Sequence, residues 1–156
     1  MGSKLAYLFL LALVLGAAVV HAEEDNYNGP SEEDVIVLDK DNLEETIFTS
    51  EDTWMLELYA PWCGHCKQLR PEWAKLATQL KGVAKVARID ASVNRQFDQT
   101  FGLKGYPTIV MIPGGAKDKS VYVPFDGART ANAMADWVKE KIKVNRGFLV
   151  ERLDSQ

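Results

Sequence analysis

Apolar residues along the chain occur with two different spacings. Short runs rich in apolar residues are typical of strands in a buried sheet, and they lie at 35–38, 54–59, 83–90, 108–112 and 121–125. Between them, apolar residues recur at steps of three and four, which predicts helices at 41–49, 66–80, 94–101 and 131–143. Strands and helices alternate until a hairpin near the end. We therefore predict an α/β domain with a mixed central sheet of about five strands and helices on both faces.

Two prolines modify this prediction. Pro71 lies within the helical pattern at 66–80, so we expect it to kink or divide that helix. Pro124 lies within the last strand and cannot donate a backbone hydrogen bond, which favours an edge position for that strand.

The two ends of the chain differ from the domain at 35–143. Residues 1–22 are typical of a signal peptide, with Lys4, an apolar run at 5–20 and small residues before the expected cleavage site. An uncleaved membrane anchor is the alternative, although the run is short for a bilayer span; we expect contact with a membrane only in that case. The acidic segment 23–34 predicts a disordered leader. The tail at 144–156 either continues the last helix or packs on the domain.

Composition excludes some classes of partner and stabiliser. With 22 acidic and 18 basic residues the formal charge is −4, and no basic block occurs, so nucleic acid is not an expected partner. Hydrophobic residues make up 47%, enough for one core without added staples. The chain has two cysteines, Cys63 and Cys66. A bridge between them closes a very small loop and stabilises a fold little, which argues against a structural role.

The segment "APWCGHCK" predicts redox chemistry. A central strand ends just before it, and a helix begins at or just after Cys63, where unpaired N–H groups and the helix dipole stabilise a thiolate. We expect Cys63 to attack and Cys66, one turn later and directed inward, to resolve the mixed disulfide. His65 between them is either a stabiliser of the thiolate or an ordinary exposed loop histidine. Gly64 keeps the turn free of bulk.

A zinc site is the main chemical alternative. Structural zinc needs four Cys or His ligands, usually as two separated pairs. The chain offers Cys63, His65 and Cys66 within one turn, and His21 would be removed with the signal peptide. One chain cannot close such a site, which leaves only a cluster shared between two chains. We expect no metal and no organic cofactor.

Two further features accompany the cysteines. Glu57 interrupts an apolar strand six residues before Cys63, so we expect it to be buried beneath the pair, with a raised pKa, and to move protons during exchange. The alternative is a solvent-facing glutamate on an edge strand. In the second feature, "GYPT", Pro107 opens a strand after a glycine and an aromatic residue. The bond before it is either cis or an ordinary trans turn, and sequence alone favours trans.

Four segments carry a resemblance to a known family: "LELYAPWCGHCKQLRPEWAKLA", "RIDAS", "FGLKGYPTIV" and "FDGARTANAMADWV". In this order they resemble protein disulfide isomerases over roughly 35–143, and the "PEW" and "ARTA" details resemble the P5-type subgroup. The resemblance implies a single thioredoxin-like domain with thiol–disulfide oxidoreductase and isomerase activity.

The resemblance also implies a role for each matching residue. Cys63 and Cys66 match the nucleophilic and resolving cysteines of a redox-active disulfide, and Glu57 the buried proton-transfer group. Arg129 matches an arginine that swings toward the second cysteine and lowers its pKa. Pro107 matches the family's cis-proline. The residues expected to contact substrate are Trp62, Gly105, Tyr106 and Pro107.

The same resemblance predicts partners and location. Unfolded or disulfide-bearing client proteins would be the substrates, with a thiol oxidase or glutathione as redox partner. We expect the protein in the lumen of the endoplasmic reticulum. A later secretory compartment or secretion is the alternative, because the sequence ends in Leu153-Asp154-Ser155-Gln156 and not in a KDEL-type signal. The alternatives are a secreted thioredoxin-like reductase and a client-binding module with an incidental redox pair.

One residue departs from the family pattern. Arg88 stands where many members have a lysine near the buried glutamate, and arginine cannot release a proton. If Arg88 paired with Glu57, it would hold that carboxylate ionised.

Overall fold

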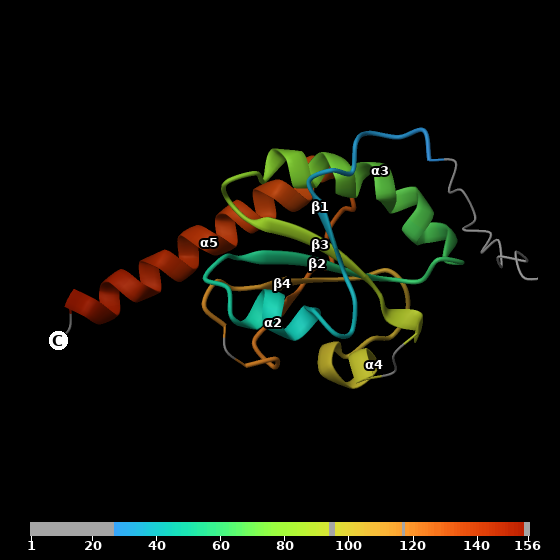
Figure 1. Ribbon diagram of the computed structural model, residues 1–156. Helices are drawn as coiled ribbons and strands as arrows, with labels where there is room; N and C mark the ends of the chain where they lie inside the picture. Colours follow the sequence, from blue (N-terminus) through green and yellow to red (C-terminus); the bar gives the residue numbers. More distant parts are fainter. Residues whose placement is uncertain (1–26, 94–95, 117, 155–156) are drawn as a thin grey trace, which may run out of the picture.

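The computed structural model describes residues 27–93, 96–116 and 118–154 (Figure 1). The expected signal peptide and the start of the leader lie outside these residues. The elements are β1 Val35–Leu38, α2 Leu43–Phe48, β2 Trp54–Tyr59, α3 Gly64–Gln79, β3 Lys85–Asp90, a 3-10 turn at Ala91–Val93, α4 Gln96–Phe101, β4 Thr108–Ile112, β5 Val123–Pro124 and α5 Ala131–Asp154.

The strands form one five-stranded sheet in the order β1-β3-β2-β4-β5. The three strands β1, β3 and β2 run parallel, whereas β4 is antiparallel to β2 and β5 to β4. The predicted mixed sheet is therefore confirmed. Strand β2, which leads to the cysteines, lies between two neighbours at the centre. Strand β5 lies at the edge, as Pro124 indicated.

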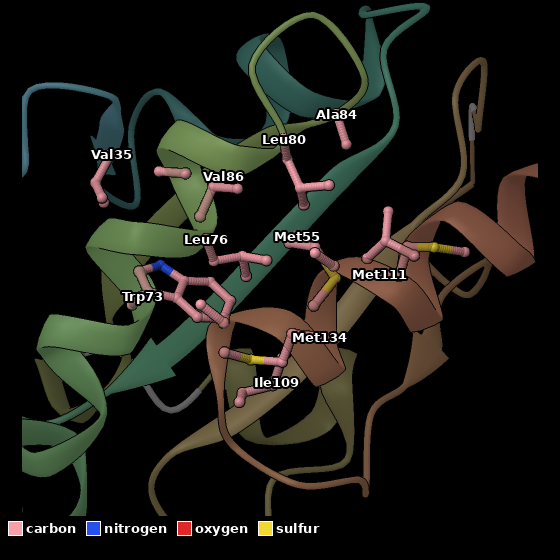
Figure 2. Close-up of a cluster of buried hydrophobic side chains, with 14 of the residues drawn as sticks. Val35, Met55, Trp73, Leu76, Leu80, Ala84, Val86, Ile109, Met111 and Met134 are labelled. Atoms are coloured by element: carbon pink, nitrogen blue, oxygen red, sulfur yellow. The ribbon is translucent and has the colours of Figure 1, made fainter.

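Helices cover both faces of this sheet (Figure 1), so that part of the predicted architecture is also confirmed. Helices α3 and α5 cover one face, where the side chains of Trp73, Leu76 and Leu80 meet those of the sheet (Figure 2). Met55 from β2 and Met134 from α5 join the same cluster. Helices α2 and α4 cover the opposite face and enclose a second apolar cluster. Apolar clusters on both faces thus enclose β2, the strand that leads to the cysteines.

Three elements refine the prediction. Strand β5 is shorter, because the backbone N–H groups of Val121 and Tyr122 bond within a turn, to Asp118 and Ser120. Helix α3 is not divided by Pro71: this residue removes one backbone bond, and the buried stripe that includes Leu69 continues past it. Helix α5 extends beyond the sheet to Asp154, so the tail continues the last helix. None of the helices within the described residues combines the length and apolarity needed to cross a membrane.

The segment before β1 contradicts the expectation of disorder for residues 27–34. Glu32 forms ion pairs with Arg70 on α3 and Arg88 on β3, at 2.6 and 2.8 Å. Asp34 pairs with Lys81 at 2.7 Å. Acidic composition suggested a solvated leader, but these carboxylates have cationic partners on the domain, and the pairs hold the segment along α3.

Candidate active site

The cysteine pair lies where β2 ends and α3 begins. The chain turns through Ala60, whose carbonyl accepts a hydrogen bond from the N–H of Cys63 at 3.0 Å. Cys63 is the N-cap of α3, and its Sγ accepts a hydrogen bond from the N–H of Cys66 at 3.2 Å. The sulfur thus caps a helix N-terminus, where donors and the helix dipole converge. A sulfur atom held in this way is placed to act as a nucleophile.

Both cysteines are present as free thiols. Their exposed fractions are similar, but the groups around the two sulfur atoms differ. Cys63 is 7% exposed and Cys66 5%, so burial alone hardly separates them. The Cys63 thiol donates to the carbonyl of Tyr106 at 3.4 Å. Burial raises the pKa of Cys66 to about 12, and its hydrogen bond to Cys63 and the charge of Glu57 act in the same direction. Cys66 therefore needs a base before it can react as a thiolate.

Glu57 is a buried carboxyl on the central strand. It is 3% exposed and lies between Arg88 on β3 and Ile109 on β4, which excludes the alternative of an edge-strand glutamate. Burial raises the pKa of Glu57 from 4.5 to about 7, and Glu32 raises it further, whereas Arg88 and Arg129 lower it. A group with a pKa near neutrality can both accept and release protons at physiological pH.

Arg88 does not hold Glu57 ionised. Its guanidinium bonds Glu32 through Nη1 at 2.8 Å, although Arg88 stands directly opposite Glu57 in the β2–β3 register. The positive charge of Arg88 therefore lowers the pKa of Glu57 without overcoming the effect of burial. From the sequence, Arg88 could pair with Glu57; in the structure it pairs with Glu32 instead.

A loop before β4 faces the cysteines. The peptide bond between Tyr106 and Pro107 is cis, against the preference that the sequence alone gave. The ring of Tyr106 meets that of Trp62 edge to face, with centroids 5.7 Å apart. Trp62 is 71% exposed, and Gly105 is exposed beside the loop. The structure thus brings together around Cys63 the four residues that we expected to contact substrate.

Comparison with known proteins identifies this arrangement. The profile of the family described as thioredoxin matches residues 34–140. The chain belongs to the thioredoxin family. Its similarity to protein disulfide isomerases, first seen in the sequence, is confirmed, and so is the likeness to the P5-type subgroup, the A6 proteins.

Individual members of the thioredoxin family show the extent of the similarity. The chain is 43% identical over 113 residues to a protein disulfide-isomerase A6 homolog of Drosophila melanogaster, covering 72% of this chain and 26% of that protein. It is 46% identical over 104 residues to protein disulfide-isomerase A6 of Mus musculus, covering 64% and 23%. The solution structure of the first thioredoxin domain of mouse protein disulfide-isomerase A4 has 35% identity and a TM-score of 0.60, covering 80% of this chain and 86% of that domain. The chain thus spans about a quarter of the curated relatives' length.

Arg129 lies beside the cis-proline loop, just before α5. Its Nη2 donates to the carbonyl of Pro107 at 3.4 Å, and its charge lowers the pKa of Glu57. It does not bond Cys66 in this structure. The swing toward the second cysteine, which the resemblance to protein disulfide isomerases implied, stays a prediction, and the observed influence of Arg129 is on Glu57.

The two residues between the cysteines are both exposed. His65 lies in the first turn of α3, and no hydrogen bond joins its ring to Cys63 in the described part of the chain. A Cβ atom added to Gly64 would meet nothing within 4 Å, so the folded domain itself does not require a glycine there. The open space at Gly64 lies on the surface beside Cys63, where another molecule would approach.

Sequence reasoning missed the residues that surround Arg88. Glu32 precedes β1, and Arg70 lies on α3, far from Arg88 in sequence. No local pattern connects them, because the three residues lie in separate parts of the chain that meet only in the folded domain. Metal chemistry gains no support, since none of the described His, Cys, Asp and Glu side chains form a group of three placed to hold an ion.

Proposed function

We propose that this chain is a thiol–disulfide oxidoreductase and isomerase that forms, reduces or rearranges disulfides in client proteins through a mixed disulfide at Cys63. The observation that carries the proposal is the position of the Cys63 sulfur. It caps α3, receives the N–H of Cys66, and lies against the loop of Tyr106 and Pro107. Glu57, with a pKa of about 7, supplies a buried proton acceptor for the second thiol.

Reduction of a client disulfide follows from this geometry. The Cys63 thiolate attacks one client sulfur, forming the mixed disulfide, and the other client sulfur leaves as a thiolate. Glu57 accepts the proton of Cys66, and the Cys66 thiolate then attacks the Cys63 sulfur. The second client sulfur leaves as a thiolate, so two electrons pass from the protein to the client. Oxidation of a client dithiol is the same sequence reversed, and rearrangement releases the mixed disulfide to another client thiol.

The surface around Cys63 suits an extended client segment. Trp62 is largely exposed, and its edge-to-face contact with Tyr106 fixes an aromatic pair beside the sulfur. Gly64 and Gly105 leave the two flanks free of side chains. Aromatic rings bind apolar client side chains, and the absence of bulk lets a client backbone approach the sulfur. We assign client contact to Trp62, Tyr106, Pro107 and Gly105.

The proposed setting is the lumen of the endoplasmic reticulum, with unfolded or disulfide-bearing proteins as clients and a thiol oxidase or glutathione as the redox partner. The expected signal peptide at 1–22 and the relatives named as protein disulfide-isomerases support it. Secretion and a later secretory compartment are the alternatives.

The reduction potential of the Cys63–Cys66 couple tests this function against a secreted reductase. Protein disulfide isomerase has a potential of about −180 mV and thioredoxin about −270 mV, a difference of about 4 kcal/mol for two electrons. We expect this chain to lie near the first value. The measurement is equilibration in glutathione buffers, followed by alkylation and mass spectrometry of the two cysteines. The double Cys63→Ser, Cys66→Ser variant provides the blank, and a value near that of thioredoxin would favour the reductase.

A further inference from the structure

We propose that Glu32, in the segment before β1, is a positioning residue for the redox reaction: by binding Arg88 it offsets the positive charge that faces Glu57. The inference rests on the proposed function, in which Glu57 accepts the proton of Cys66. Neither the comparisons nor the sequence motifs assign a role to Glu32.

The Glu32 carboxylate bridges two arginines. Its Oε1 accepts hydrogen bonds from Arg70 Nε at 2.9 Å and Arg88 Nη1 at 2.8 Å. Its Oε2 accepts hydrogen bonds from Arg70 Nη2 at 2.6 Å and Arg88 Nη2 at 3.5 Å. The side chains of Glu32, Arg70 and Arg88 are 18%, 20% and 18% exposed. Charge-assisted bonds in such a sheltered place are strong and are weakly screened by salt.

The β2–β3 register places this cluster next to Glu57. Residues in register on neighbouring strands point to the same face of a sheet, and Arg88 is the partner of Glu57 in the β2–β3 pair. Arg88 therefore brings a positive charge next to the buried carboxyl. With Glu32 in place, the cluster of two arginines and one carboxylate has a net charge of +1. Without that carboxylate it would have a net charge of +2.

Charged and titratable groups from several elements act on Glu57. They are Arg88 on β3, Glu32 before β1, Arg129 before α5, Cys66 on α3 and Tyr59 on β2 itself. Burial is the largest influence on the pKa of Glu57, Arg88 and Arg129 lower it, and Glu32 raises it. Among these groups Glu32 is the carboxylate, so it alone offsets the arginines.

The consequence concerns the proton of Cys66. If Glu32 lost its charge, Glu57 would face an unbalanced Arg88 and would ionise at lower pH. Ionised Glu57 would then be a weaker base, poorly matched to a thiol whose pKa is about 12. The attack of Cys66 on the mixed disulfide would be slower at neutral pH, while the first attack by Cys63 would be unaffected.

The test replaces Glu32 with its uncharged near-isostere, Glu32→Gln, and follows the carboxyl of Glu57 by carbon-13 NMR as pH is varied. We expect the titration midpoint of Glu57 to move to lower pH by roughly one pH unit, because the positive charge of Arg88 is no longer offset by the Glu32 carboxylate. The matched control is Asp34→Asn, which removes a carboxylate from the same segment but one that pairs with Lys81 and Thr78. That variant should leave the midpoint in place.

The variant Arg88→Gln tests the other half of the charge balance. In this variant the midpoint of Glu57 should rise, because the positive charge opposite the carboxyl is removed. An unchanged midpoint in Glu32→Gln, an equal shift in Asp34→Asn, or a midpoint that does not rise in Arg88→Gln would each overturn the proposal. The titration needs no client, so its outcome is separate from that of the activity measurements.

Discussion

Replacing Cys63 with serine should reduce turnover of a disulfide-bearing peptide in glutathione buffer by at least about a thousandfold, because the step that forms the mixed disulfide is lost. A serine hydroxyl is not appreciably ionised at neutral pH and cannot form a disulfide. The remaining thiol, Cys66, has a pKa of about 12 because of its burial, so it cannot take over the attack. The measurement is the rate of peptide reduction or oxidation, followed by mass spectrometry.

The geometry of α3 makes this substitution a clean test. Cys63 is the N-cap, and serine is among the best N-cap residues, so its Oγ can accept the hydrogen bond that Cys66 N–H now donates to sulfur. Circular dichroism and the midpoint of thermal unfolding should therefore change little. Turnover at the native rate in a folded Cys63→Ser variant would exclude Cys63 as the nucleophile.

The variant Glu57→Gln should slow the steps that involve Cys66 by about a hundredfold at neutral pH, the usual contribution of a positioned general base. In the native chain, the rate of resolution should rise with pH through about 7 as the Glu57 carboxyl ionises and becomes able to accept the Cys66 proton. In Glu57→Gln that inflection should be absent, while the first attack by Cys63 is retained. Stopped-flow kinetics of the two steps against pH distinguishes these outcomes.

Removing the same carboxyl should also stabilise the protein above neutral pH. The pKa of Glu57 is raised from 4.5 to about 7 on folding, so the folded state holds this proton more tightly than the unfolded chain. That contribution to stability is fully present below pH 4.5 and is lost as pH rises through 7, where the buried group must be ionised. Glu57→Gln lacks this cost, and its free energy of unfolding at pH 8 should exceed that of the native chain by about 3 kcal/mol. Equal pH dependence of urea unfolding in the two proteins would contradict the assignment.

The sequence predicted those parts of the fold that depend on local pattern. The alternation of strands and helices fixed the order of the elements, and the apolar run at Thr108–Ile112 became β4 with the predicted bounds. The helix start at the cysteines followed from the turn before it. The predicted extent of β5 was wrong, because a turn outside the strand uses its backbone donors. The sequence leaves open whether the tail continues the last helix, and the structure shows that it does.

Some residues of the candidate site could also be predicted from local sequence, and others could not. Cys63 and Cys66 are neighbours in the chain, so their chemistry was visible in one short motif, and Glu57 stood out as a charge within an apolar strand. Glu32 was assigned to a disordered leader. Its partners, Arg70 and Arg88, lie on α3 and β3, and only the folded chain brings the three residues together. Long-range pairing of this kind leaves no periodic signal in a single sequence.

The most direct test of the exchange mechanism is to incubate reduced Cys66→Ser protein with a disulfide-bearing peptide and map the adduct by tandem mass spectrometry. Without the second thiol the mixed disulfide cannot be resolved from within the chain, so it should accumulate. The mechanism predicts one peptide per chain, attached at Cys63, and no adduct in the Cys63→Ser variant. Failure of the Cys66→Ser variant to form an adduct, or equal adduct formation when Cys63 is the residue replaced, would contradict it.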